Sequence, residues 1–262
     1  MIGRAGISLI LALVLGLSEA WAERPRVVLA ATPIARLDLP WWHARFAAKA
    51  AELRKEKPAL VFYGDSITQN YERSSTDPTA DYAPIWRRFY GDRHAVNLGF
   101  TGDTTANLLW RIEHGEAEGI APKVAVVLIG ANNFGRLRWS AEDTLAGIRA
   151  DVEALRKRLP TTKILLLGIL PSGRGEEVER KRAQVNAALG QVYAHDPAVK
   201  FVDLSAVFLR DGRVAESLYL DPELKPPRPA LHPSAEGQAR MAAAIEPVLA
   251  ALLGDRNHLL SH

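Results

Sequence analysis

The chain has 262 residues, of which 48% are hydrophobic and 24% are charged, which is the composition of a globular protein with one sizeable core. Its formal net charge of +3 is small for this length, and no Lys/Arg block interleaved with aromatic residues stands out. We therefore expect no nucleic-acid partner. The sequence contains no cysteine, which excludes both a disulfide and a cysteine-linked lipid.

Residues 1–22 have the pattern of a cleavable export signal. Arg4 supplies the positive start, residues 7–17 form a short apolar run, and Ala20-Trp21-Ala22 matches the small-x-small cleavage pattern. The alternative is a membrane anchor, but the apolar run is shorter than the roughly 20 residues that span a bilayer. We predict a periplasmic or secreted protein that begins at Glu23 and has no stable membrane anchor.

Residues 23–57 are predicted to form an N-terminal extension whose helix packs on the main domain. Within it, residues 26–29 favour a short strand, and Pro40 stands in the first turn of a helix with apolar residues at helical spacing. The adjacent rings of Trp41 and Trp42 suit a platform for sugar stacking, but packing of the helix on the core explains them as well.

Between residues 58 and 254, continuous apolar runs alternate with amphipathic segments. Apolar runs without polar alternation are typical of parallel strands that are covered on both faces. The predicted strands are 59–63, 95–98, 124–129, 164–170 and 200–204. The predicted helices are 85–90, 105–114, 141–159, 176–193 and 234–253. This alternation predicts an α/β fold, a three-layer α/β/α sandwich around a central parallel five-stranded sheet, with a frayed tail at residues 255–262.

Three polar positions fall at the same edge of the predicted sheet. Ser66 follows the first of these strands in the sharp turn Gly64-Asp65-Ser66, Gly102 follows the second, and Asn132 follows the third. Ligands of open parallel sheets bind outside the carboxyl ends of the strands, so this edge is where an active site is expected. Each residue also has an ordinary structural interpretation, since Ser and Asn cap helices and Gly forms turns.

The seven histidines can be sorted by the same criterion. His94 and His195 each precede a strand and His114 ends a helix, so these three belong to the opposite edge. The remaining candidates lie in the N-terminal helix, in the tail, or in the loop before the final helix, and are His43, His258, His262 and His232. Only His232 reaches the carboxyl edge. Serine-dependent acyl transfer needs an imidazole that takes and returns a proton, which makes His232 the predicted general base for Ser66.

Donors for a developing oxyanion lie at the same edge. The backbone N–H groups of Ser66 and Gly102 and the side-chain amide of Asn132 are the predicted oxyanion hole. Loss of one such donor typically costs about 3 kcal/mol of transition-state stabilisation. No convincing cluster of metal ligands stands out, and this chemistry requires no cofactor.

Together, these segments resemble the four blocks of the SGNH or GDSL hydrolase superfamily, in the family's order. The matching segments are 64–68, 97–105, 130–133 and 232–233. Over residues 58–254 the chain is most similar to the platelet-activating-factor acetylhydrolase-like and bacterial acetylesterase branches. The resemblance implies a flavodoxin-like sandwich with strand order 2-1-3-4-5 and ester hydrolysis by a serine nucleophile.

One position departs from the family pattern. The last block of the family usually reads Asp-x-x-His, but Pro229 stands three positions before His232. The carboxylate that would orient the imidazole must then come from Asp221 or Asp203, or a main-chain carbonyl takes its place. We favour Asp221, because the stiff proline-rich segment 222–229 can fold it back toward His232.

The sequence favours a secreted serine esterase that hydrolyses short acyl esters, O-acetyl esters above all, of a small molecule or polysaccharide. A hydrolase of short-chain lipid esters or thioesters is the alternative within the class. A non-catalytic carbohydrate-binding or accessory protein is the alternative outside it, motivated by Pro229. A nucleotide-binding module is disfavoured, because no glycine-rich phosphate loop follows the first main strand. The sequence does not specify an oligomeric state.

Overall fold

A computed structural model describes residues 26–260, so the predicted export signal at residues 1–22 lies outside the described part. All five predicted strands are present, with ends shifted by a few residues. They form one parallel sheet in the order β2-β1-β3-β4-β5, which is also the order that the family resemblance implied. The strands are β1 (Leu60–Gly64), β2 (Ala95–Gly99), β3 (Val124–Leu128), β4 (Lys163–Leu167) and β5 (Val199–Val202).

Helices cover both faces of this sheet. The longer helices are α1 (Pro40–Glu56), α3 (Ala83–Tyr90), α4 (Thr105–Arg111), α6 (Ala141–Arg158), α7 (Glu176–Val192) and α9 (Ala235–Leu253). Shorter helices are α2 (Ser66–Gln69), α5 (Ala131–Gly135) and α8 (Ser205–Phe208). A small hairpin joins β6 (Leu209–Arg210) and β7 (Arg213–Val214). The remaining turns are 3₁₀ or π segments: η1 (Leu29–Ala31), η2 (Asn70–Glu72), η3 (Pro78–Ala80), η4 (Ile112–Glu116), η5 (Glu216–Leu218) and η6 (Asp221–Glu223).

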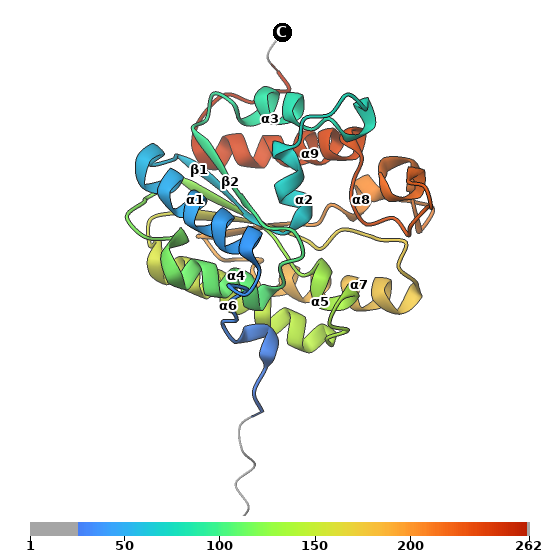
Figure 1. Cartoon of the computed structure of the whole chain (residues 1–262), viewed down its shortest axis with the longest axis horizontal. Helices are drawn as coiled ribbons and strands as arrows, with labels where there is room; N and C mark the ends of the chain where they lie inside the picture. Colours follow the sequence, from blue (N-terminus) through green and yellow to red (C-terminus); the bar gives the residue numbers. More distant parts are fainter. Residues whose placement is uncertain (1–25, 261–262) are drawn as a thin grey trace, which may run out of the picture.

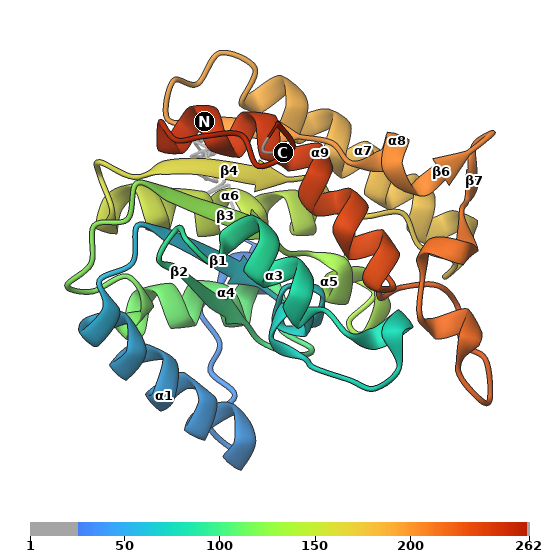
Figure 2. The ribbon, with the colours of Figure 1, turned by 90° about the horizontal axis from the view of Figure 1, so that it is seen from above.

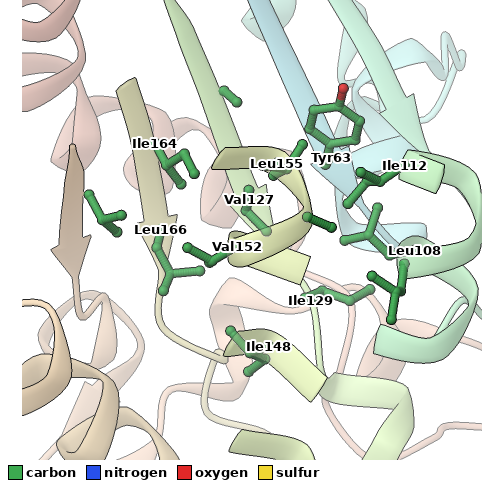
Figure 3. Close-up of a cluster of buried hydrophobic side chains, with 14 of the residues drawn as sticks. Tyr63, Leu108, Ile112, Val127, Ile129, Ile148, Val152, Leu155, Ile164 and Leu166 are labelled. Carbon is green, nitrogen blue, oxygen red and sulfur yellow. The ribbon is translucent and has the colours of Figure 1, made fainter. Parts of the chain in front are cut away.

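The sheet separates two apolar cores, because successive side chains of a strand point to opposite faces. Tyr63 and Val127 pack with α4, α6 and α7 on one face, and Figure 3 shows Val152 of α6 lying against that face. Phe62 and Val126 pack with α3 and α9 on the other face. In Figure 1 these two helical layers lie on opposite sides of the sheet, which confirms the predicted three-layer sandwich.

The predicted strand at residues 26–29 is wrong. The chain instead turns through η1, where Thr32 N donates to Leu29 O at 3.1 Å, and it then follows α4, with Ile34 N donating to Ala106 O at 3.0 Å. Val27 and Leu29 are 71% and 52% exposed. Two of the apolar residues that suggested a strand therefore face solvent, and the carbonyls of Val28 and Leu29 accept local hydrogen bonds of the η1 turn instead of pairing in a sheet.

The helix predicted after Pro40 is present as α1, and its two tryptophans lie in different environments. Trp42 is fully buried, its Nε1 donates to Asp103 Oδ1 at 2.8 Å, and its ring packs beside Phe100. Trp41 is 43% exposed, with the guanidinium of Arg36 at 5.4 Å from its ring centroid. Core packing thus explains Trp42, and the two rings do not form one sugar platform.

The prediction of a frayed tail is wrong for residues 255–260. Arg93 donates to both carboxylate oxygens of Asp255, at 2.9 and 3.0 Å, and forms a buried ion pair with Glu246 at 2.7 Å. His258 is buried, and its backbone N–H donates to Glu246 Oε1 at 2.7 Å. A buried charge cluster therefore holds the end of the described chain against α9. Within residues 26–260, no helix has the length and apolar character needed to cross a membrane.

The topology gathers three loops at one edge of the sheet. The chain passes from β1 to β2 on one side and then returns to β3 on the other side of β1 (Figure 2). Gly64 at the end of β1 is in register with Gly99 of β2 and with Leu128 of β3. The loops after these strands therefore meet at the position where parallel sheets bind their ligands.

Candidate active site

The hydroxyl of Ser66 and the imidazole of His232 are in hydrogen-bonding contact. Ser66 is the first residue of α2, and its Oγ lies 3.0 Å from His232 Nε2 although 166 residues separate the two in sequence. Ser66 is only 8% exposed, whereas the His232 side chain is 29% exposed. The predicted nucleophile and general base are thus brought together at the carboxyl edge of the sheet.

Asp221 supplies a carboxylate on the far side of the same imidazole. Its Oδ1 lies 2.9 Å from His232 Nδ1, and its Oδ2 accepts the backbone N–H groups of Leu231 at 2.9 Å and of His232 at 2.5 Å. Because an ionised carboxylate only accepts, the hydrogen on Nδ1 is assigned to the contact with Asp221. Nε2 is then free to accept the Ser66 proton, which is the arrangement that a serine nucleophile needs.

A backbone bridge holds Asp221 and His232 together across the proline-rich loop. Leu220 N donates to His232 O at 2.8 Å, and an isolated antiparallel bridge joins Tyr219 to Pro233. The loop therefore closes on itself and returns Asp221 to a histidine eleven residues later. Pro229 does not contribute a carboxylate, but the structure has one at the position where the imidazole needs it.

Hydrogen bonds favour the ionised form of Asp221. Burial alone would raise its pKa, but the side-chain and backbone hydrogen bonds from His232, with that from Leu231, outweigh burial and lower the pKa below its ordinary value. The group facing the imidazole is therefore an anion across the neutral pH range. An anion at this position stabilises the imidazolium that forms when Ser66 loses its proton.

Asp65 shapes the turn that presents Ser66. Its Oδ1 accepts the N–H of Ile67 at 2.9 Å, which caps α2, and its Oδ2 lies 3.5 Å from Asn132 Nδ2. Asp65 is almost completely buried, and this burial raises its pKa to about 6 despite the opposing hydrogen bond from Ile67. Asp65 is thus a structural carboxyl beside the nucleophile rather than a partner of the imidazole nitrogens.

The predicted oxyanion donors surround this turn. Asn132 lies in α5 directly after β3, and its Nδ2 donates to Asp103 O at 2.9 Å. The second hydrogen of that amide is held only by the long 3.5 Å contact with Asp65. Gly102 has a φ of +78°, a backbone conformation that strongly favours glycine, and it precedes Asp103 in the loop after β2. The amide of Asn132 is thereby fixed to the loop that carries Gly102.

A buried ion network beneath this loop was not predicted. Arg111 is fully buried, donates to Asp103 Oδ2 at 2.8 Å, and also forms an ion pair with Glu116. The same guanidinium donates to Leu98 O at 3.1 Å and to Gly64 O at 3.2 Å. The available sequence signal was a charged residue in the otherwise apolar run Leu108-Leu109-Trp110-Arg111. A charge on an apolar helix face requires a buried partner, but the sequence does not identify the partner.

Other predicted candidates lie elsewhere. The carboxylate of Asp203 accepts hydrogen bonds from Ser205 N at 2.9 Å and from Ser205 Oγ at 2.6 Å, so it is occupied at the start of α8. Tyr71 and Phe134, two aromatic residues close in sequence to Ser66 and Asn132, are 2% and 3% exposed and belong to the two cores. In the described part of the chain, no group of three or more acidic or histidine side chains is arranged to hold a metal ion.

Comparison with known proteins identifies the class to which this fold and site belong. A model of the GDSL-like lipase/acylhydrolase family matches residues 62–240. The chain belongs to this family and is a carboxylic ester hydrolase, as the sequence resemblance predicted.

Individual relatives agree with this assignment. The platelet-activating factor acetylhydrolase IB subunit alpha1 of Homo sapiens is 33% identical over 213 residues, 80% of this chain and 82% of that protein. A GDSL-like lipase from Bacteroides thetaiotaomicron has a similar structure, with TM-score 0.60, 19% identity and coverage of 80% and 97%. An acetyl-xylooligosaccharide esterase from Geobacillus Stearmophilus has TM-score 0.52, 19% identity and coverage of 76% and 95%. These two structural likenesses concern the fold alone.

The first prediction concerns Asp221. Asp221→Asn should lower kcat for p-nitrophenyl acetate by about three to four orders of magnitude, because an amide NH₂ facing Nδ1 favours the tautomer in which Nε2 cannot accept a proton. Asp203→Asn is the matched control, since its carboxylate is bonded to Ser205 and not to the imidazole. A near-normal kcat for Asp221→Asn would contradict the assigned geometry.

The second prediction concerns the buried carboxyl of Asp65. With a folded pKa of about 6 against an ordinary value of 3.8, Asp65 must ionise inside the protein as the pH rises through 6, whereas the unfolded chain ionises near pH 4. The contribution of Asp65 to the free energy of unfolding therefore falls between pH 4 and pH 7. Asn keeps an acceptor for Ile67 and does not titrate. In urea unfolding, the free energy of unfolding of Asp65→Asn relative to that of wild type should increase by about 2 to 3 kcal/mol between pH 4 and pH 7.

Asp77→Asn is the control for this titration. Asp77 caps η3 through Thr79 N in the way that Asp65 caps α2, but it is exposed and its hydrogen bonds to Thr79 lower its pKa. Replacing Asp77 should therefore not raise the free energy of unfolding relative to wild type between pH 4 and pH 7. A stability difference between Asp65→Asn and wild type that stays constant with pH would show that the buried carboxyl does not titrate as described.

Proposed function

We propose that the protein is an exported serine esterase that removes acetyl or other short acyl groups by an acyl-enzyme mechanism, with Ser66, His232 and Asp221 as its catalytic residues. The observation that carries the proposal is the continuous contact from Ser66 Oγ to His232 Nε2 at 3.0 Å and from His232 Nδ1 to Asp221 Oδ1 at 2.9 Å. Membership of an acylhydrolase family supports the reaction class.

In the proposed reaction, His232 takes the Ser66 proton while Ser66 Oγ attacks the ester carbonyl. The negative charge on the carbonyl oxygen is stabilised by the N–H groups of Ser66 and Gly102 and by the amide of Asn132. This amide donates to the oxyanion with the hydrogen that otherwise makes only the long contact with Asp65. His232 then returns the proton to the leaving alcohol, and a water molecule activated by the same imidazole hydrolyses the acyl-enzyme.

For the substrate, we propose an O-acetyl ester on a carbohydrate. The Homo sapiens relative is named an acetylhydrolase, which supports a short acyl group. The Geobacillus neighbour, which has a similar fold, is named an acetyl-xylooligosaccharide esterase, and this name supports an acetylated carbohydrate as the substrate. Short-chain lipid esters and thioesters are the competing substrates.

The third prediction tests the nucleophile. A fluorophosphonate probe should label wild type at Ser66, and wild type should hydrolyse p-nitrophenyl acetate at least about a thousand times faster than Ser66→Ala, because the alanine variant cannot form an acyl-enzyme. Mass spectrometry of the labelled peptide, together with initial rates, provides the measurement.

A substrate panel accompanies this experiment. Acetylated xylooligosaccharides, short-chain glycerolipid esters and acetyl thioesters are compared by kcat/KM at one pH and ionic strength. Faster turnover of the lipid ester or the thioester would replace the carbohydrate assignment. If wild type neither labels nor exceeds the rate of Ser66→Ala, the protein is a binding or accessory protein and the esterase proposal fails.

The fourth prediction concerns export. If residues 1–22 are a cleaved signal, protein expressed from the full sequence in a bacterial host should be recovered from the periplasm or medium with Glu23 as its first residue. N-terminal sequencing and cell fractionation measure both. Replacing residues 10–13 of the apolar run with charged residues is the control, and it should leave the uncleaved chain inside the cell. Cytoplasmic protein that retains Met1 in the unaltered chain would refute export.

A further inference from the structure

Arginine side chains lie close to the proposed oxyanion loop. A Cβ added to Gly102 would lie 2.5 Å from Arg136 Nη1 and 3.5 Å from the Nη atoms of Arg36. Arg36 comes from the N-terminal segment, whereas Arg136 directly follows α5. The absence of a side chain at Gly102 therefore leaves the space in which two guanidinium groups approach the loop that carries one of the oxyanion donors.

A third arginine approaches from the loop after β4. Arg174 Nη1 donates to Ala131 O at 2.9 Å, and a Cβ added to Gly135 would lie only 2.1 Å from the same nitrogen. Arg174 also interacts electrostatically with the carboxylates of Asp65, Glu179 and Asp221. It is half-buried, and burial lowers its pKa from the ordinary value.

We call Arg36, Arg136 and Arg174 the rim. The positive charge of these three side chains is not fully neutralised by carboxylates of the protein. Arg36 is paired with Asp103 at 2.8 Å, and Asp103 is fully buried. Among residues 26–260, neither Arg136 nor Arg174 forms an ion pair with a carboxylate. Arg136 is exposed, and its Nη1 donates a long hydrogen bond of 3.4 Å to Gly102 O.

The nearby acidic groups do not cancel this charge at the surface. Asp65, Asp103 and Asp221 are at most 5% exposed and lie beneath the guanidinium groups. Glu179, which also acts on Arg174, is 23% exposed but is paired with Arg182. Asp221 is committed to His232, and Asp103 to Arg36 and Arg111. Arg36 and Arg136 both approach Gly102, so their like charges repel one another, and an anion bound beside Arg136 relieves that repulsion.

We propose that Arg136 and Arg174 form an anion-binding subsite beside the oxyanion hole, and that the substrate carries a carboxylate or phosphate group near its scissile ester. A planar guanidinium pairs with both groups through two parallel hydrogen bonds, which gives orientation as well as attraction. This inference rests on the proposed function and narrows its substrate class, from acetylated carbohydrates in general to those that bear an acidic group.

The fifth prediction tests the subsite with matched esters. One pair is 4-acetoxybenzoate and its neutral methyl ester, and a second pair is acetylglycerol 3-phosphate and acetylglycerol. For each pair, kcat/KM of the anionic ester is divided by that of the neutral ester, and this ratio is compared between wild type and variants. Intrinsic leaving-group reactivity cancels in that comparison. The ratio should fall about fivefold in Arg136→Gln, as expected for one partly exposed charge pair, and further in Arg136→Glu.

Arg54→Gln is the matched control. Arg54 is an exposed arginine in the last turn of α1, just before β1 begins, so it lies at the opposite edge of the sheet. Its replacement removes the same net charge without altering the rim, and the ratio should stay at the wild-type value. A fall of equal size in Arg54→Gln would mean that overall charge, rather than a subsite, selects the anion, and would overturn the inference.

The remaining outcomes separate this inference from the proposed function. If Arg136→Glu keeps the wild-type ratio in both pairs while the neutral esters are hydrolysed in a Ser66-dependent way, the subsite is refuted and the esterase proposal stands. If wild type hydrolyses p-nitrophenyl acetate but no member of either pair, the subsite is refuted and the esterase proposal stands. If it hydrolyses neither p-nitrophenyl acetate nor any of these esters, the proposed function fails and the subsite with it. A fall confined to one pair supports the subsite and identifies carboxylate or phosphate as the group it binds.

Discussion

The candidate site depends on the buried guanidinium of Arg111. This one group donates to Gly64 O at the end of β1, to Leu98 O in β2 and to the carboxylate of Asp103, and it lies 4.0 Å from the centroid of the Phe100 ring. A fully buried charge is tolerated only when its donors are satisfied and its charge is paired. The contacts that satisfy Arg111 tie the ends of β1 and β2 to the loop that carries Gly102. They therefore help to fix Ser66, which follows β1, relative to Gly102.

The N-terminal segment completes this arrangement. The Asp103 carboxylate receives Arg111 on one oxygen, and Arg36 and the indole of Trp42 on the other. The same segment accepts the Thr105 hydroxyl at Ala30 O, at 2.7 Å. The family match begins only at residue 62, yet these contacts come from residues before it. The extension therefore helps to hold the loop that carries Gly102, and it places the charge of Arg36 beside that glycine.

The sequence was sufficient for the features that depend on local pattern. Continuous apolar runs identified the five strands, and sorting residues by strand end placed Ser66, Gly102, Asn132 and His232 at one edge. The sequence was not sufficient for contacts between residues that are far apart in the chain. The ion network of Arg111 joins residues whose pairing has no local signature, and the segment at 26–29 was misread because its exposed apolar side chains mimic a strand. The tail was misread because the buried Glu246 that holds it lies on another element.

The loop from Asp221 to His232 shows why a sequence motif alone does not identify the carboxylate that orients the histidine, whereas the backbone contacts of the loop do. A carboxylate three residues before a histidine and one eleven residues before it reach the same imidazole nitrogen only if the chain between them is closed. Here the closure is made by the bridge between Tyr219 and Pro233 and by the hydrogen bond from Leu220 N to His232 O. Once that bridge forms, Asp221 also caps the Leu231 and His232 amides, so the carboxylate stabilises the loop and orients the base with the same two oxygens. Pro229 is compatible with this arrangement because the hydrogen bonds that close the loop come from Leu220, Arg228, Leu231 and His232, and none of them requires an N–H at position 229.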